Sequence, residues 1–119
     1  MVLLPGGARS GVSQLRRGIL QFCVLALLRD GEKYAFEVVR ELSDAHGFMT
    51  SEGTIYPLLA RLRKEGWVST AWQESDSGPP RRYYTLTSTG RHALAEFAEE
   101  WMPFKTAVDK LLGSEESHE

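Results

Sequence analysis

The sequence predicts a mainly α-helical fold with a small β-hairpin, and three features of the pattern indicate it. Three stretches with apolar residues at helical spacing come first, two short runs rich in β-branched and aromatic residues follow, and a long apolar seam comes last. With 119 residues, 42% hydrophobic and 25% charged, the composition is that of one globular domain. We find no internal repeat and no linker that would separate two domains.

The first predicted helix follows an irregular segment, residues 1–11, which contains Pro5 and three glycines and which we expect to be a flexible tail. The helix covers residues 12–29, and its apolar side chains occupy nearly every side. In so small a chain, such a helix needs cover from a partner subunit. Leu15 and Ile19 are the candidates for that contact.

Two more helices are predicted before residue 66. The second covers residues 34–45 with one apolar stripe, and Gly47 suits its C-terminal cap. Ser51 suits the N-cap of the third helix, which ends at Gly66. The core-facing residues of the third helix recur at helical spacing and are Ile55, Leu58, Leu59 and Leu62. Its opposite face shows Thr54, Tyr56, Pro57, Ala60, Arg61, Arg63 and Lys64.

Pro57 is an anomaly in the third helix. A proline in a helix interior removes one ladder hydrogen bond and costs about 3 kcal/mol. The loss is smaller near the start of the helix, where Pro57 stands, and we expect a functional gain to offset it.

A hairpin is predicted next. Residues 67–73 and 82–87 are rich in β-branched and aromatic side chains and are expected to be strands. Residues 74–81, which contain Pro79 and Pro80, are expected to be a loop. The pattern therefore predicts a projecting tip, stiffened by proline, that holds Arg81 and Arg82.

The last predicted helix covers residues 88–112 and carries a seam with spacing 3-4-3-4-3. Such a helix is roughly 35 Å long and outreaches the domain, so its seam needs another helix to pack on. Pro103 is expected to kink it, and the acidic residues 113–119 are expected to be disordered. The seam and the first helix together predict a dimer interface, whose candidate residues are Leu15, Ile19, Leu94, Phe97, Trp101, Phe104, Val108 and Leu111.

The inventory of reactive residues excludes several classes of function. Cys23 is the only cysteine, so no disulfide forms within the chain, and a cytoplasmic location is expected. The longest apolar run, residues 19–28, is shorter than the roughly 18–20 residues of a membrane span, and no signal peptide is expected. No catalytic set, phosphate-binding glycine loop or metal-ligand spacing is present, so we expect no enzyme, no cofactor and no metal.

Charge is distributed unevenly along the chain. The net charge is −2, yet residues 1–90 carry eleven Lys and Arg against nine Asp and Glu, while residues 91–119 carry three against seven. The basic groups gather in two short stretches, residues 61–64 and 81–82. Ordinary surface charge would also produce this pattern, so charge alone leaves the function open.

The order helix, helix, helix, hairpin, helix predicts a winged helix-turn-helix over residues 12–87 with a C-terminal dimerisation helix over residues 88–112. The third helix is then the recognition helix, whose hydroxyl groups and arginines suit phosphates and guanine edges in the major groove. The hairpin arginines suit phosphates or the minor groove. We therefore expect double-stranded DNA as the partner.

Several motifs resemble the PadR family of transcriptional regulators. Residues 50–66, which contain Gly-Thr-Ile-Tyr-Pro, resemble the recognition helix of that family, and residues 78–87 and 89–91 resemble its wing and the entry to its last helix. Residues 34–38 resemble the start of its second helix, and the likeness covers about residues 14–112. The single C-terminal helix is similar to the short-tailed subgroup. The resemblance implies a homodimer that represses transcription at inverted-repeat operators and releases DNA when a small aromatic or hydrophobic effector binds.

The resemblance also implies which residues meet DNA and ligand. The resemblance places Tyr34, Thr54, Tyr56, Pro57, Arg61, Arg81 and Arg82 at the DNA surface, and Ser51 and Lys64 of the third helix complete the candidate DNA-binding set. Trp101 falls where a tryptophan of multidrug-binding relatives stacks on flat ligands, and the candidate ligand set is Phe22, Phe97, Trp101 and Phe104. The same aromatic residues could simply be dimer core. A winged-helix module that binds a protein in place of DNA is the alternative function, and a steep loss of DNA affinity with added salt would argue against it.

Overall fold

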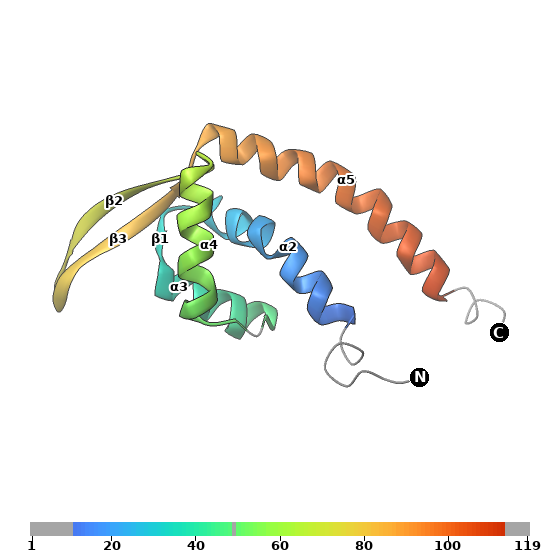
Figure 1. Ribbon diagram of the computed structural model, residues 1–119, viewed down its shortest axis with the longest axis horizontal. Coiled ribbons are helices and arrows are strands. Elements are labelled where there is room, and N and C mark those ends of the chain that lie inside the picture. Colours follow the sequence, from blue (N-terminus) through green and yellow to red (C-terminus); the bar gives the residue numbers. More distant parts are fainter. Residues whose placement is uncertain (1–10, 49, 114–119) are drawn as a thin grey trace.

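The computed structural model describes residues 11–48 and 50–113 and confirms a mainly helical chain with a small sheet (Figure 1). The expected tails fall almost wholly outside the described residues, apart from Gly11 and Gly113, which belong to helices. In chain order the elements are α2 (Gly11–Leu28), β1 (Lys33–Tyr34), α3 (Ala35–Arg40), the π-helix η1 (Glu41–Ala45), α4 (Glu52–Lys64), β2 (Val68–Ser75), β3 (Gly78–Leu86) and α5 (Ser88–Gly113).

The molecule is elongated because two parts leave its helical body, as Figure 1 shows. The hairpin β2–β3 projects on one side, and α5 runs out on the other side as an arm above α2. The principal extents are 58 × 32 × 25 Å, and the 26 residues of α5 span about 39 Å. Helix α5 continues through Pro103 without interruption.

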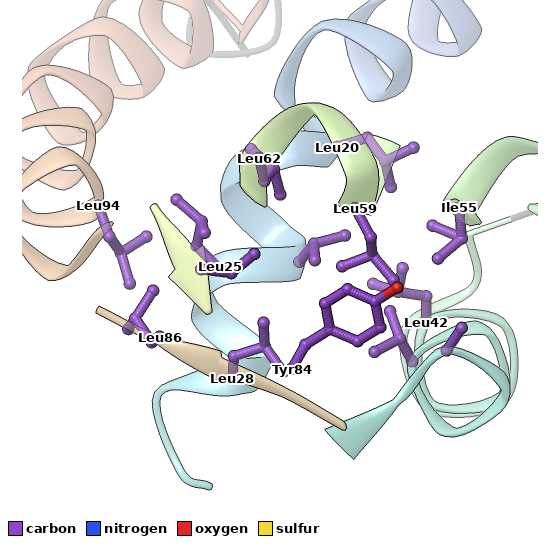
Figure 2. Packing of buried hydrophobic residues seen from close by; sticks show 14 residues of the cluster. Leu20, Leu25, Leu28, Leu42, Ile55, Leu59, Leu62, Tyr84, Leu86 and Leu94 are labelled. Atoms are coloured by element: carbon purple, nitrogen blue, oxygen red, sulfur yellow. The ribbon is translucent and has the colours of Figure 1, made fainter. Parts of the chain in front are cut away.

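The core lies where α2, α3, η1 and α4 meet the inner face of the hairpin (Figure 2). Leu25, Leu28, Leu59 and Leu62 are fully buried, and each such side chain contributes roughly 1.5–3 kcal/mol. The ring of Tyr84 points from β3 into this cluster (Figure 2). The stripe predicted for the third helix is confirmed for Ile55, Leu59 and Leu62, whereas Leu58 is only partly buried at its margin.

The second helix begins one residue later than predicted, because Tyr34 belongs to a strand. Lys33 and Tyr34 pair with Tyr84 and Tyr83, which makes a three-stranded antiparallel sheet in the order β1-β3-β2. The backbone N–H of Tyr34 donates to the Glu37 carboxylate at 3.1 Å, which satisfies one orphan donor at the start of α3. A pairing with residues about fifty positions away leaves no trace in local periodicity.

The predicted loop over residues 74–81 is also wrong, since the strands extend to Ser75 and resume at Gly78. Pro79 and Pro80 therefore lie within β3. Ser75 lies opposite Gly78, and Gln73 lies opposite Arg81. Between these two pairs, the two prolines of β3 face a single residue of β2, which makes a β-bulge. Prolines are tolerated there because β1 pairs with β3 only at Tyr83 and Tyr84, and this end of β3 has a free edge.

A compact junction joins the hairpin to α5. The Thr87 hydroxyl donates to the Gly66 carbonyl at 2.7 Å and accepts from the Gly90 N–H at 3.0 Å. The Thr87 N–H donates to the Trp67 carbonyl at 3.1 Å. A Cβ atom placed on Gly90 would lie 2.1 Å from that same carbonyl oxygen, so only glycine lets α5 approach this closely.

We expect Gly90→Ala to lower the free energy of unfolding by about 3 kcal/mol, because the added methyl group overpacks against backbone that cannot move aside. Gly18→Ala is the control, since nothing lies within 4 Å of its Cβ position and helix propensity favours alanine by about 1 kcal/mol. Urea unfolding measures both. Equal stability of the two variants would contradict the close approach of α5.

Candidate nucleic-acid interface

The outward face of α4 is the central element of the candidate interface. Five members of the candidate DNA-binding set lie exposed on it, namely Thr54, Tyr56, Pro57, Arg61 and Lys64. Ser51 has the extended backbone of an N-cap residue, and its carbonyl accepts from the Ile55 N–H at 2.9 Å. Its hydroxyl makes no capping hydrogen bond.

Pro57 lies exposed on this same face, in the second turn of α4. Because proline has no N–H, the carbonyl of Gly53 receives no helical hydrogen bond from position 57. The exposed position leaves that carbonyl open to water or to a partner, which keeps the cost of the proline low.

Arg61 lies at the edge of α4 that faces α2. Its guanidinium donates to the Gln21 side-chain oxygen at 3.3 Å and to the Glu65 carboxylate at 3.4 Å. Both partners are at the long end of hydrogen-bond distances, and the Glu65 pair is half-exposed, so these contacts hold the side chain only weakly. Arg61 thus lies beside α2 with a guanidinium group that its neighbours hold only loosely.

The two hairpin arginines lie on opposite faces of β3, because successive strand residues alternate. The Arg82 guanidinium lies 4.9 Å from the centroid of the Trp72 ring, its cross-strand partner. The Arg81 guanidinium lies 4.4 Å from the centroid of the Tyr34 ring, which packs edge-on against Tyr83 at 5.4 Å. The expectation that one tip holds both arginines is therefore wrong. Arg81 lies on the face of β3 that packs against Tyr34, and Arg82 lies on the opposite face, which carries Tyr84.

Tyr84 lies where the hairpin packs against α4. Burial raises the pKa of its phenol, the Arg82 and Arg63 charges lower it, and Tyr56 adds to the rise. Side chains of both α4 and β3 are therefore near enough to act electrostatically on this hydroxyl group. Arg63 is a member of this group that the candidate set lacks, although the helical pattern already placed it on the exposed face.

Trp72 is the other residue that sequence reasoning missed. It is 63% exposed, which is high for a large aromatic side chain, and it shields one face of Arg82. Only the strand register shows that Trp72 stands opposite Arg82, so composition gave no signal for the pair.

A second group, the aromatic row, lies along α2 and α5. Phe22 stacks on Phe97 with centroids 4.2 Å apart and planes 3° apart, and Phe97 stacks on Trp101 at 5.8 Å. Phe104 extends the row beyond Trp101 at 6.0 Å, and Trp67 extends it beyond Phe22 at 6.0 Å. The structure thus brings together all four residues of the candidate ligand set and adds Trp67. The separations are typical of favourable aromatic pairs, except that the Phe22–Phe97 stack is closer.

The candidate dimer residues divide into two classes. Leu94 is 8% exposed and belongs to the core of its own subunit, so the surface seam of α5 begins at Phe97. Phe104 and Leu111 are exposed at 55% and 75%, and Trp101, Val108 and Ile19 are partly buried. Leu15 is exposed on α2 beside Val12. A subunit in solution would present these apolar side chains to water.

The described part of the chain holds no group of three or more His, Cys, Asp or Glu side chains that could bind a metal ion. Within the same residues, every helix is too short or too polar to cross a bilayer. Burial raises the pKa of the Cys23 thiol, which favours its protonated form.

Comparison with known proteins decides the family. The sequence matches the model of the PadR-like transcriptional regulators over residues 24–96, from the middle of α2 into α5. The chain belongs to the PadR-like family. It is therefore a DNA-binding transcriptional regulator with a winged-helix fold, and not an enzyme. Members of the family act as dimers.

Solved structures of relatives agree with this fold. A PadR-like regulator from Bacillus cereus is 36% identical, with a TM-score of 0.76 over 83% of this chain and 96% of that one. A PadR family regulator from Eggerthella lenta is 38% identical, with a TM-score of 0.78 over 87% of this chain and 90% of that one. These relatives share the body, the hairpin and the long last helix of this regulator.

Two further relatives are similar in sequence. A transcriptional regulator of Mycobacterium tuberculosis is 35% identical over 83 residues, which is 70% of this chain and 76% of that protein. The negative transcriptional regulator PadR of Bacillus subtilis is 25% identical over 92 residues, which is 76% of this chain and 50% of that protein.

We expect Tyr84 of this PadR-like regulator to titrate above the ordinary range of a tyrosine, because burial disfavours its phenolate and so raises its pKa. Its folded pKa is raised, so the stability it contributes is complete below about pH 10 and is lost as the pH rises through the folded pKa. Tyrosinate absorbance followed against pH measures this. The late step should vanish in Tyr84→Phe, and its persistence there would contradict the assignment.

Proposed function

We propose that this PadR-like regulator is a homodimeric repressor that binds an inverted-repeat operator and releases it when a small aromatic or hydrophobic effector binds. The observation that carries the proposal is the exposed face of α4, on which hydroxyl, tyrosine and basic side chains lie together. The negative regulatory role in the name of the Bacillus subtilis relative favours repression.

In this proposal residues 12–87 bind DNA, with α4 in the major groove. Thr54, Tyr56 and Pro57 lie on the exposed face that would meet base edges and sugars, and Lys64 supplies charge at the far end of α4. Arg82 on Trp72 and Arg81 on Tyr34 would contact phosphates to one side of the groove. Each guanidinium is held over a ring, which reduces the rotamer entropy lost on binding.

Residues 88–112 supply the dimer interface together with α2. The seam from Phe97 to Leu111, which is exposed at Phe104 and Leu111, and the exposed Leu15 of α2 are the apolar surfaces that a second subunit would cover. An isologous pairing of this kind would set two α4 helices roughly 34 Å apart, the spacing of successive major grooves. The two half-sites of the operator would then be related as an inverted repeat.

The aromatic row is the proposed effector site. It follows the seam from the body to the arm, so a flat ring stacked on Trp101 would lie between the body of one subunit and the arm of the other. An effector acts only if it binds the DNA-free arrangement more tightly than the DNA-bound one. The alternative, in which these rings are dimer core alone, predicts no ligand response.

The test of the DNA proposal is fluorescence anisotropy of a labelled duplex from the upstream region of the regulator's own gene, against a scrambled duplex and across a salt series. Selective binding at two subunits per site, with affinity falling steeply as salt rises, supports a dimeric DNA-binding regulator. Weak and equal binding to both duplexes would direct attention to a protein partner.

We expect Arg82→Ala and Arg61→Ala each to weaken operator binding and to reduce the magnitude of the salt slope by about 2 per dimer, one phosphate contact per subunit. Lys105→Ala is the control, because Lys105 pairs with Asp109 on the arm, away from the proposed DNA face. If both arginine variants bound like wild type, the DNA face would be assigned wrongly.

We expect a planar aromatic compound that binds the regulator to quench the fluorescence of Trp101 and to lower operator affinity, because it stacks on the aromatic row. Trp101→Ala should lose the quenching, whereas Trp72→Phe, on the hairpin, should keep it. Quenching without any change in operator affinity would refute the effector mechanism and leave the DNA proposal intact.

A further inference from the structure

A pocket of about 220 Å³ lies between the first half of α2 and the start of α4. Arg16 and Arg17 of α2 line one side, and Thr50 and Thr54 line the other. Leu20 and Phe48 supply its apolar wall. Only Thr54 of these six residues belongs to the candidate DNA-binding set, so the α2 side of the pocket has no role in the function described so far.

The two arginines of the pocket lack a counter-charge. Neither makes an ion pair or hydrogen bond within residues 11–48 and 50–113, and α2 contains no acidic residue. Lys33, Arg61 and Lys105, by contrast, all have carboxylate partners. Two adjacent guanidinium groups that share one pocket repel each other, and an anion bound between them would offset this repulsion.

The opposite wall of the pocket presents donors. The Thr50 hydroxyl oxygen is buried and has no hydrogen-bond partner in the described structure, which is unfavourable for a polar atom. A rotation of its side chain within the pocket would let it donate to an anion. Thr54, which also lines this wall, lies in the first turn of α4, where the helix dipole attracts negative charge.

The position of the pocket favours a polymer phosphate over a free ion. A second hollow of about 380 Å³ shares Arg17, Leu20 and Thr54 with it and continues along α4 to Pro57 and Arg61. The two hollows form one basic groove along the α2 side of α4. Arg63 and Arg82 lie on the hairpin side, where their charges reach Tyr84. Positive charge thus flanks α4 on both sides, as the two phosphate backbones flank a major groove about 12 Å wide.

We propose that Arg16, Arg17, Thr50 and Thr54 form a binding site for one backbone phosphate of DNA, on the α2 side of the groove that α4 enters. The proposal rests on the proposed DNA binding and adds to it a clamp from the first helix. Such a contact carries no sequence information, so it strengthens binding to every duplex and fixes the register of α4 in the groove.

The first experiment compares the double variant Arg16→Gln, Arg17→Gln with Arg29→Gln, which removes an exposed and unpaired charge at the other end of α2. Anisotropy against salt should show the double variant binding both operator and scrambled duplex about tenfold more weakly, with a salt slope smaller by about 2 per dimer. The control should match wild type. If the double variant also matches wild type while wild type binds DNA, the phosphate site is refuted and the DNA-binding function stands.

Two further measurements separate the site from a folding defect. Thr50→Val removes an unsatisfied buried hydroxyl, so it should keep or raise the melting temperature while lowering DNA affinity. A scan with neutral methylphosphonates at single phosphates should find one position per half-site that weakens wild type and does not weaken the double variant further. If every methylphosphonate weakened the double variant as much as it weakened wild type, the proposal would be overturned. If wild type bound no duplex at all, the proposed function itself would be refuted.

Discussion

The contact of Gly90 with the Trp67 carbonyl is the constraint on which the arrangement of the molecule depends. It brings the first turn of α5 against the start of β2, and the Thr87 hydroxyl ties the same turn to Gly66 at the end of α4. The direction of the arm is therefore set by backbone groups. A side chain at position 90 would tilt a helix about 39 Å long, and a small angle at its base becomes a large displacement at its far end.

That direction also determines which aromatic rings meet. Because α5 leaves the body over α2, Phe97 stacks on Phe22, and the row continues to Trp101 and Phe104 where the arm has passed the core. One end of the row belongs to the folded subunit and the other end to the surface that a second subunit would cover. A ligand bound there would act on the junction of the two, which is where a small change in angle alters the distance between recognition helices.

The proposed DNA face depends on β3 in a comparable way. Successive residues of β3 alternate between two faces, one with Arg82 and Tyr84 and one with Arg81 and Tyr83, and pairing with β1 brings Tyr34 to the second face. The bulge at Pro79 and Pro80 maintains this register while leaving the end of the hairpin unpaired on one edge. Positive charge therefore lies on α2, on α4 itself and on β3 of the hairpin.

Local chemistry in the sequence determined much of this protein: the helices over residues 12–28 and 52–64, the buried Ile55, Leu59 and Leu62, the exposed basic face of α4, and the motifs of the PadR-like family. Helical periodicity and short motifs act over a few residues, so they can be recognised without contacts. Only the tertiary structure decided that Tyr34 belongs to a strand and that Leu94 lies in the core. The same holds for the placement of Arg81 and Arg82 on opposite faces of β3, and for the pocket that Arg16 and Arg17 line together with Thr50. Each of these depends on strand register or helix packing between distant segments, which a local pattern does not encode.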